Sequence, residues 1–231
     1  MSGNPSEHKK TKALECHRIL VFGQSGSGKT SIINKFCYDA LFCSYNYDPT
    51  LDDSDRKQAN VDQLPCIIDI AASTCPEEYT ALRELLIRQH EGFLLVYSVD
   101  SRSSLDQIRL FHKHIQREKA QTTASICLVG NKCDLVNEGR QVTPEEGAQL
   151  AAELNIGCFY ETSVKNDINI EEAFHALVRE NRVHKDGKSQ SMASEMETSG
   201  NEAQLEHRRP VIWQRFLHYC RRSKAARASR Q

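Results

Sequence analysis

The sequence lacks several features that define common classes of protein. No apolar run approaches the length of about 18 residues that a membrane-spanning helix requires, so we expect no segment that crosses a bilayer. The N-terminal stretch MSGNPSEHKKTK is polar and charged and lacks the apolar core of a secretory signal, so we expect no export signal. With 231 residues, 39% of them hydrophobic, the chain is long enough to bury the core of one domain of ordinary size.

A disulfide framework is also missing. Nine cysteines in a small secreted chain would suggest one, but here several lie inside apolar, strand-like runs, namely Cys66, Cys127 and Cys158. We therefore expect reduced thiols in the cytosol.

Acidic residues are absent from one end of the chain. Residues 208–231 contain eight Lys or Arg and no Asp or Glu, whereas the rest of the chain carries 31 acidic groups against 22 basic ones. Within PVIWQRFLHYCRRSKAARASRQ (210–231), the apolar side chains share one helical face: Ile212, Trp213, Phe216, Leu217 and Cys220. A basic amphipathic segment of this kind favours an anionic membrane surface, and Cys220, beside two arginines, is a candidate for palmitoylation. A calmodulin-type partner, an import signal and a solvated tail are the alternatives.

What the sequence does have is an alternation of apolar runs and amphipathic segments. RILVF (18–22), GFLLVYS (92–98) and SICLVG (125–130) are near-continuous apolar runs, which is typical of strands in a parallel sheet covered on both faces. Helical periodicity appears in 103–118 and 168–180, where apolar residues recur on one face. The pattern predicts an α/β fold arranged as a three-layer sandwich.

Two local signals add detail to this fold. The segment TPEEGAQLAAEL begins with Thr143 as N-cap, Pro144 at the first helical position and Glu146 closing a capping box, which predicts the start of a helix. The stretch 54–70, with a turn near 61–63, predicts one antiparallel hairpin.

The domain boundaries follow from composition. We expect a flexible N-terminus over 1–15, a folded domain over about 16–185, a disordered linker over 186–206 and a basic amphipathic tail over 207–231. The linker, DGKSQSMASEMETSGNEAQLE, contains almost no large apolar side chains and cannot bury enough surface to offset the entropy of ordering.

A glycine-rich loop follows the first apolar run. GQSGSGKT (23–30) matches G-x-x-x-x-G-K-[ST] and lies between RILVF and the helical run SIINKFCYD, the context in which loop N–H groups and a helix N-terminus bind phosphates. The candidate nucleotide-binding residues are Gly23, Gln24, Ser25, Gly26, Ser27, Gly28, Lys29, Thr30 and Ser31. Lys29 would reach the outer phosphates, and the hydroxyl of Thr30 would ligate Mg²⁺. The alternative, a Gly/Ser-rich surface loop, does not account for the order of strand, motif and helix.

NKCD (131–134) follows the apolar run SICLVG and indicates which base would bind. A carboxylate at Asp134 can accept two hydrogens, from N1 and N2 of guanine, a pair that adenine lacks. Asn131 would brace the neighbouring loops, and the stem of Lys132 would lie along the base. From ETSVK (161–165), the candidates for contacts with the base edge are Ser163, Val164 and Lys165. Alone, N-K-x-D is compatible with a polar turn; its place well downstream of a phosphate-binding loop makes it specific.

Together these residues resemble the Ras-like small GTPases, and the Ras branch in particular. GQSGSGKT, YDPT (47–50), EEY (77–79), HEGFLLVYSVD (90–100), NKCD and ETSVK occur in the family's order and near its spacing, over residues 16–185. The resemblance implies a P-loop three-layer sandwich with a mostly parallel, six-stranded sheet flanked by five helices. It also implies that the chain binds GTP or GDP with Mg²⁺ and that effector proteins and an exchange factor are its partners. No nucleic acid is expected among them.

YDPTLDDSD (47–55) corresponds to the family's first switch. The resemblance makes Thr50 a ligand of Mg²⁺ that also meets the terminal phosphate, and Tyr47 a nucleotide contact. The effector surface that it implies comprises Tyr47, Asp48, Pro49, Thr50, Leu51, Asp52, Asp53, Ser54 and Asp55. Two departures leave the identity of the effector open. The loop between Thr30 and Thr50 is slightly longer than in the family's pattern, and Asp55 stands where an aromatic residue is usual.

The second switch departs further from the family's pattern. Anchored on EEY, ASTCP (72–76) aligns with the family's Asp-Thr-Ala-Gly-Gln. Ala72 replaces the carboxylate that orients a Mg²⁺-bound water. Cys75 replaces a glycine, and Pro76, which has no amide N–H, replaces the glutamine that positions the attacking water. Asp69 lies three positions back on a strand and faces the other side of the sheet, so it cannot substitute for the missing acid.

No catalytic residue of the usual second switch is therefore intact, and we expect GTP hydrolysis to be very slow, because phosphoryl transfer depends on positioning and charge stabilisation. Ser25 stands where the family usually has glycine, and its side chain either crowds an arginine supplied by a partner or is harmless. The Cys-a-a-X box that usually ends the Ras branch is replaced by Ala-Ser-Arg-Gln, so we expect no prenylation.

The sequence thus predicts a Ras-like guanine-nucleotide switch in signalling, at the cytoplasmic face of a membrane, in particular the plasma membrane, or in the cytosol. One alternative is a pseudo-GTPase scaffold that binds nucleotide without turnover. Another, from a different class, is a P-loop ATPase or small-molecule kinase, against which Asp134 argues.

Overall fold

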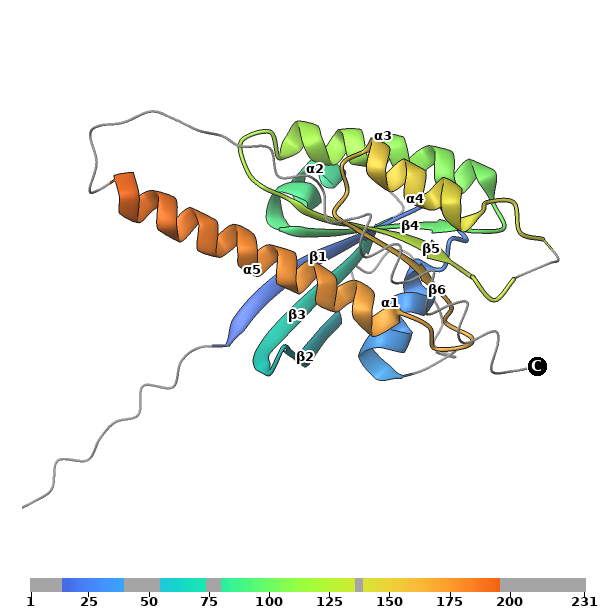
Figure 1. The fold of residues 1–231 in the computed structure, drawn as a ribbon, viewed down its shortest axis with the longest axis horizontal. Helices are drawn as coiled ribbons and strands as arrows, with labels where there is room; N and C mark the ends of the chain where they lie inside the picture. The colour runs from blue at the N-terminus through green and yellow to red at the C-terminus, as the bar shows by residue number, and fades with distance from the viewer. Residues whose placement is uncertain (1–13, 40–54, 74–79, 136–138, 196–231) are drawn as a thin grey trace, which may run out of the picture.

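The computed structural model describes residues 14–39, 55–73, 80–135 and 139–195 (Figure 1). In chain order the elements are β1 (Glu15–Phe22), α1 (Lys29–Tyr38), β2 (Asp55–Val61), β3 (Leu64–Ser73), α2 (Thr80–Gln89), β4 (Gly92–Ser98), α3 (Arg102–Glu118), β5 (Ser125–Asn131), α4 (Pro144–Glu153), β6 (Cys158–Thr162) and α5 (Ile170–Glu195). The apolar runs form strands and the amphipathic segments form helices, as the periodicity predicted.

The strands form one six-stranded sheet in the order β2-β3-β1-β4-β5-β6. Only β2 runs antiparallel to its neighbour; the pairs β1–β3, β1–β4, β4–β5 and β5–β6 are parallel. Helices α1 and α5 cover one face, and α2, α3 and α4 cover the other, which gives three layers (Figure 1). The predicted α/β sandwich with a mostly parallel sheet is confirmed.

Two apolar cores lie on the two faces of the sheet, and β1 contributes to both. Ile19 and Val21 pack under α1 and α5, whereas Leu20 and Phe22 pack under α2, α3 and α4. All four side chains are buried. Successive side chains of a strand point to opposite faces, so a strand covered on both sides must be apolar at every position. This is why RILVF has no polar residue after Arg18.

The predicted hairpin is present and turns in two residues. β2 and β3 pair with Val61 opposite Leu64, and the turn residues Asp62 and Gln63 have φ of 53° and 65°. Positive φ at both central positions is the geometry of a type I′ turn, whose twist matches that of the flanking strands.

The predicted start of α4 is also confirmed. Thr143 is the N-cap, its side chain accepts a hydrogen bond from the backbone N–H of Glu146, and the Glu146 carboxylate accepts one from the N–H of Thr143 in return. Pro144 occupies the first helical position, where its missing N–H has no consequence.

Helix α5 is longer than the composition suggested. It continues to Glu195, past the predicted domain boundary at 185, so the predicted linker over 186–206 begins inside a helix. Because extending an established helix requires far less ordering than starting one, a mainly polar segment such as DGKSQSMASE (186–195) can prolong it. The predicted flexible N-terminus, the end of the linker and the basic tail lie outside the described residues, except that 14 and 15 are described and Glu15 begins β1.

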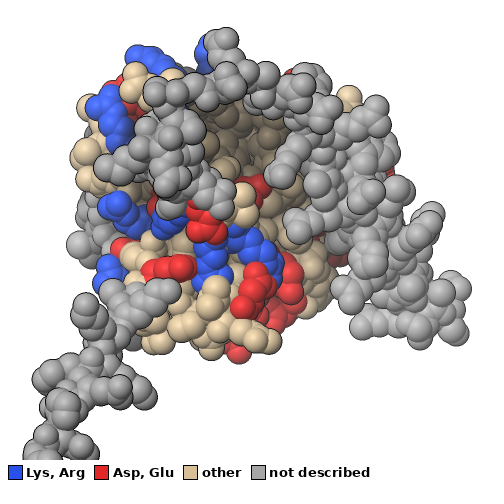
Figure 2. All heavy atoms as spheres, turned by 60° about the vertical axis from the view of Figure 1, so that its left-hand side comes forward, with Lys and Arg blue, Asp and Glu red and all other residues tan. Residues whose placement is uncertain are grey.

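Charged side chains fasten α5 to the amino end of the sheet. The ion pairs are Arg179–Asp62, Arg182–Glu15 and Lys185–Glu91, with nitrogen–oxygen distances of 2.8, 2.9 and 2.9 Å. Figure 2, which brings forward the side where α5 passes the starts of β1 and β3, shows basic and acidic side chains gathered against one another. Among the described residues, no helix has both the length and the apolar character needed to cross a bilayer.

Candidate nucleotide-binding site

The glycine-rich loop joins the carboxyl end of β1 to the N-terminus of α1. Gly26 and Gly28 have φ of 81° and 93°, a region that side chains disfavour, and Gly28 is the N-cap of α1. The ammonium of Lys29 donates to the carbonyl oxygens of Gly23 and Gln24 at 2.9 and 3.0 Å. No acidic residue lies in the first turn of α1, so no carboxylate there opposes an anion at the helix N-terminus.

Two of the loop glycines leave no room for a side chain. A Cβ on Gly23 would lie 2.2 Å from the carbonyl oxygen of Val96, and a Cβ on Gly28 would lie 2.2 Å from Nδ2 of Asn131. The loop is therefore wrapped tightly against β4 and β5. A bare backbone, a lysine and the exposed Thr30 hydroxyl at a helix N-terminus form a donor set that fits the phosphates of a nucleotide and their Mg²⁺.

Asn131, at the end of β5, joins three segments that meet at the carboxyl edge of the sheet. Its Nδ2 donates to the carbonyl oxygen of Ser27 at 3.0 Å, and its Oδ1 accepts from the hydroxyl of Thr162 at 3.2 Å. Asn131 is 2% exposed, so both bonds form away from water. These two bonds fix the positions of the glycine-rich loop, β5 and β6 relative to one another.

Asp134 is held by the loop that follows β6. The Ser163 hydroxyl donates to Oδ1 of Asp134 at 2.6 Å, and the same hydroxyl accepts from the backbone N–H of Asn166 at 3.1 Å. Ser163 is fully buried, whereas Asp134 is partly exposed. The buried Ser163 hydroxyl thus orients the carboxylate of Asp134, which remains accessible to a ligand.

Lys132 adopts a backbone conformation that is unusual for lysine, with φ of 66°. Its ammonium lies 3.0 Å from Oδ2 of Asp100, a residue that follows directly after β4 and Val99. The sequence interpretation did not include Asp100. Its position at the carboxyl end of β4, next to β5 in the sheet, is the signal that could have found it.

The structure therefore brings together the predicted residues of the loop 23–31 and of NKCD and ETSVK at one edge of the sheet. Val164 is partly buried there, and Lys165 is exposed. Other predicted site residues lie outside the described residues: Tyr47, Asp48, Pro49, Thr50, Leu51, Asp52, Asp53 and Ser54 in the first switch, Cys75 and Pro76 in the second, and Cys220 in the tail. Asp55 is described; it begins β2 and accepts a hydrogen bond from the Tyr38 hydroxyl at 2.5 Å.

Comparison with known proteins identifies the family. The family model described as "Ras family" matches residues 18–183. The chain belongs to the Ras family. "Ras-like protein 1" of Pyricularia oryzae is 43% identical over 188 residues, which cover 73% of this chain and 76% of the relative. "Ras-like protein 1" of Saccharomyces cerevisiae is 44% identical over 179 residues, 78% of this chain and 55% of the relative. "Protein ras-2" of Neurospora crassa is 39% identical over 205 residues, 80% of this chain and 87% of the relative.

Membership of the Ras family makes the chain a small GTP-binding protein and accounts for the arrangement of the site. Ras-family proteins bind guanine nucleotides, typically with Mg²⁺, and generally act through effectors and exchange factors. The phosphate loop at β1–α1 and the carboxylate after β5 lie at the carboxyl ends of parallel strands, where ligands of open α/β sheets bind.

In this Ras-family chain, the end of β3 offers no carboxylate to the site. Ala72 pairs with Val21 of β1 and is exposed. Asp69 alternates to the other face of the strand, and its Oδ2 lies 2.9 Å from a guanidinium nitrogen of Arg56 on β2. The described part of β3 therefore agrees with the sequence argument that Asp69 cannot replace the missing acid.

The pKa values of two ionisable groups in or beside the base-recognition loop, NKCD (131–134), are shifted by their surroundings. Burial opposes ionisation of Asp100, but its contacts with Ser98 and Lys132 outweigh burial and lower the pKa of the carboxyl. Burial, together with the carboxylates of Glu161 and Asp134, raises the pKa of the Cys133 thiol to about 11. Asp100 is therefore charged at neutral pH, whereas Cys133 is a protonated thiol and a poor nucleophile.

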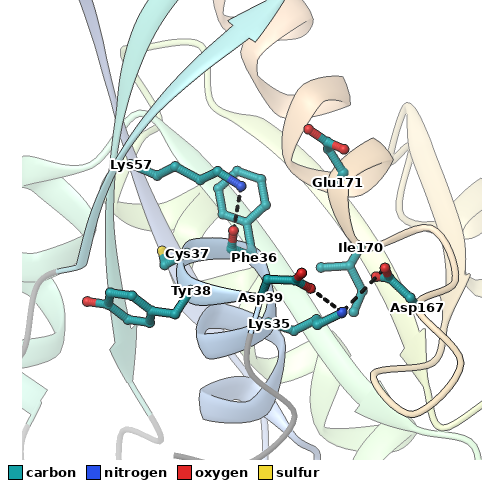
Figure 3. A pocket seen from close by; sticks show the side chains of 9 residues that line it. All are labelled: Lys35, Phe36, Cys37, Tyr38, Asp39, Lys57, Asp167, Ile170 and Glu171. Atoms are coloured by element: carbon teal, nitrogen blue, oxygen red, sulfur yellow. Dashed lines mark hydrogen bonds and ion pairs between the residues drawn. The ribbon is translucent and has the colours of Figure 1, made fainter.

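A separate cavity of about 530 Å³ lies at the other end of α1 (Figure 3). Its two lysines point toward partners within the protein: Lys35 forms ion pairs with Asp39 and Asp167, and Lys57 donates to the carbonyl oxygen of Phe36 at 2.5 Å. Since α1 has 10 residues, this cavity is separated from the phosphate loop by the length of the helix, about 15 Å. It is not the nucleotide site.

Proposed function

We propose that this chain is a guanine-nucleotide-dependent signalling switch whose GTP hydrolysis is very slow. One contrast carries the proposal: the phosphate loop and the base-recognition loops are connected by hydrogen bonds through Asn131, whereas the described end of β3 presents Ala72 where the family has a carboxylate. The site therefore keeps the groups needed to bind nucleotide but lacks a group needed to hydrolyse it.

The binding role rests on the geometry of described side chains. Lys29 and the α1 N-terminus would hold the outer phosphates, and Asp134 would accept hydrogen bonds from guanine. Mg²⁺ would neutralise charge on the phosphates; its ligands would be the hydroxyl of Thr30 and, by the family resemblance, that of Thr50, which lies outside the described residues. The Ser163 hydroxyl supports guanine recognition because it fixes the carboxylate of Asp134 before the nucleotide arrives.

The slow turnover rests on what is missing. A water that attacks a phosphate must be oriented, and phosphoryl transfer depends on such positioning more than on covalent chemistry. Ala72 cannot orient a water, and the nearest carboxylate on the strand, Asp69, is engaged by Arg56. The sequence adds that Pro76 has no side-chain or backbone donor at the glutamine position.

Single-turnover hydrolysis of GTP by the full-length chain with Mg²⁺ tests this proposal, after GTP and GDP binding has been measured against ATP. We expect tight guanine-nucleotide binding with little phosphate release over hours. The double variant Ala72→Asp, Pro76→Gln should release phosphate at least about tenfold faster, since losing even one positioned group that acts in the transition state can cost about 10²–10³ in rate. Ala81→Asp, which adds a carboxylate on the exposed side of α2, is the matched control and should leave release unchanged.

The outcomes also separate the alternative functions. Tight GTP binding with no detectable release, even in the double variant, would indicate a pseudo-GTPase scaffold. Rapid release by the unmodified chain would contradict slow turnover. Binding of ATP as tightly as GTP would indicate a P-loop ATPase or kinase and would remove the role proposed for Asp134.

We further propose that the chain meets its effector through residues 47–55, receives nucleotide through an exchange factor, and associates with the cytoplasmic face of the plasma membrane through its basic tail. The support is the acidic first switch together with the excess of Lys and Arg over 208–231. Co-sedimentation of the full chain with vesicles containing phosphatidylserine tests the membrane role. Equal recovery with neutral vesicles, or none with either kind, would contradict it; Cys220→Ser reports whether that cysteine contributes in cells.

A further inference from the structure

The structure places a second carboxylate, Asp100, at the NKCD loop in addition to the motif acid Asp134. Oδ2 of Asp100 lies 3.0 Å from Nζ of Lys132, and the two side chains are 30% and 38% exposed. This pair joins the end of β4 to the loop after β5. It therefore links a strand that contributes no recognition motif to the lysine of NKCD.

Asp100 lies in a turn that backbone hydrogen bonds connect to neighbouring elements. The backbone N–H of Val99 donates to the carbonyl oxygen of Asn131 at 3.0 Å, and the N–H of Ser101 donates to that of Ser98 at 3.0 Å. Ser101 is in turn the N-cap of α3 and accepts from the backbone N–H of Ser104. The carboxylate thus projects from a framework that is tied to both β5 and α3.

The backbone on the other side is equally constrained. The N–H of Cys133 donates to the carbonyl oxygen of Thr162, and the N–H of Leu135 donates to that of Lys132, both at 3.0 Å. The left-handed conformation of Lys132 is held by these bonds. What remains free to vary is the long side chain itself, and the structure shows its far end held by Asp100.

We propose that Asp100 is a positioning residue that slows the release of guanine nucleotide by holding the Lys132 side chain in the orientation needed to lie against the bound base. The inference rests on the proposed nucleotide-binding function. A lysine side chain loses substantial rotamer entropy when it is ordered, and an ion pair formed before binding removes that loss from the binding step. Such a gain lengthens the lifetime of the complex more than it speeds association.

Release of a fluorescent GDP analogue from the full-length chain with Mg²⁺ is the first test. We expect release from Asp100→Ala to be about three- to tenfold faster, the range for a partly exposed ion pair plus the ordering of one lysine. Asp100→Asn keeps an acceptor oxygen but loses the charge, so its release rate should lie between those of the unmodified chain and Asp100→Ala. Glu153→Ala is the matched control, because it removes an ion pair of α3 with α4, Arg109–Glu153, that lies away from the site; its release rate should equal that of the unmodified chain.

Ionic strength distinguishes positioning by charge from a general structural effect. Release from the unmodified chain should accelerate with salt, because the pair is partly exposed and is screened, whereas release from Asp100→Asn should depend less on salt. Equal salt dependence in the two proteins would overturn the role of the charge.

A third measurement needs no nucleotide. In the nucleotide-free chain, an amine-reactive reagent followed by mass spectrometry should label Lys132 faster in Asp100→Ala than in the unmodified protein, with Lys35 as the internal reference. Unchanged labelling would show that the ion pair does not hold the side chain, and it would overturn the inference.

GDP binding by the unmodified chain distinguishes failure of the proposed function from failure of the role of Asp100. Absence of GDP binding by the unmodified chain would overturn the proposed function itself. GDP binding with an unchanged release rate in Asp100→Ala would overturn only the role of Asp100.

Discussion

The two ends of the sheet are held together by different means. At the carboxyl end, the glycine-rich loop and the loops after β5 and β6 are joined mainly by hydrogen bonds: the buried amide of Asn131 contacts Ser27 and Thr162, and the Ser163 hydroxyl donates to Asp134. At the amino end, α5 is fastened across β1, the β2–β3 turn and the start of β4 by Arg179, Arg182 and Lys185.

The difference shows how the molecule separates ligand binding from stability. Hydrogen bonds at the carboxyl end position groups that a ligand must meet, so they require close approach and special backbone conformations such as those of Gly28 and Lys132. The ion pairs at the amino end depend less on exact geometry, and they lie at the opposite end of the strands from the candidate nucleotide site. A change at the carboxyl end should therefore alter nucleotide binding, and a change at the amino end should alter only the free energy of unfolding.

Among these changes, Asp134→Asn should cause the largest loss of nucleotide binding at the carboxyl end of the sheet. The amide cannot accept both guanine hydrogens, and a site built to pair with specific ligand groups discriminates by about 10⁴-fold when a partner is lost. We expect GDP affinity to fall by about that order in equilibrium titration. The melting temperature of the nucleotide-free protein should change little, because the Asn oxygen can still accept from the Ser163 hydroxyl. Retained GDP affinity would show that this carboxylate does not select the base.

Gly28→Ala should affect binding and stability together. The added Cβ would meet Nδ2 of Asn131 at 2.2 Å, and the residue would keep a φ of 93°. We expect a loss of about 2–4 kcal/mol in the free energy of unfolding, from overpacking plus backbone strain. Urea unfolding measures the loss, and titration with GDP should show weaker binding.

Gly139→Ala is the control that isolates the clash. Gly139 has a φ of 91°, yet among the described residues no atom lies within 4 Å of its Cβ position, so we expect its substitution to carry mainly the backbone strain. We expect a loss of about 1 kcal/mol and unchanged GDP binding. Equal losses for the two variants would mean that the contact between the glycine-rich loop and Asn131 has no energetic weight.

Glu91→Gln tests the amino end of the sheet, because it removes a charge that pairs with Lys185 and should lower the free energy of unfolding without changing nucleotide binding. Burial opposes ionisation of Glu91, but contacts with His17 and Lys185 outweigh it and lower the pKa to about 2 from 4.5. A depressed pKa contributes stability that is present above pH 4.5 and is lost as the pH falls toward 2. Since the side chain is partly exposed, we expect the variant to lose only about 1 kcal/mol at pH 7.

The measurement is urea unfolding of the two proteins at several pH values. The difference between them should be constant from pH 7 to about pH 5 and should shrink below that. GDP binding should be the same in both proteins. A difference that grows toward low pH would show that Glu91 is not stabilised in its charged form.

Much of the fold was predictable because it depends on short-range rules. RILVF had to become a doubly covered strand, since a strand buried on both faces is apolar at every position, and the hairpin turn was visible in the sequence near 61–63. Thr143 and Glu146 predicted the start of α4 from their own spacing. Each of these signals lies within one turn or one strand of the structure that it specifies.

The end of α5 was not predictable in the same way. Composition placed the boundary at 185, because the residues that follow have no apolar stripe. The helix continues to Glu195, ten residues beyond the ion pair of Lys185 with Glu91, because extending an established helix needs much less ordering than starting one. The apolar content of a segment indicates whether it can contribute to a core, but it does not indicate whether the segment can extend a helix that has already formed.

By itself, the sequence determined most of the elements, the phosphate loop with its helix and the carboxylate of NKCD, because each of these patterns lies within a short stretch of the chain. The loss of a carboxylate at Ala72 followed from aligning the sequence with the family's pattern. Only the tertiary structure decided that Asp100 contacts Lys132, that Arg56 pairs with Asp69, and that the bracing expected of Asn131 consists of hydrogen bonds to Ser27 in the glycine-rich loop and to Thr162 in β6. These contacts depend on the order of the strands in the sheet. Strand order is set by the packing of the whole core, and it brings together side chains that no local pattern relates.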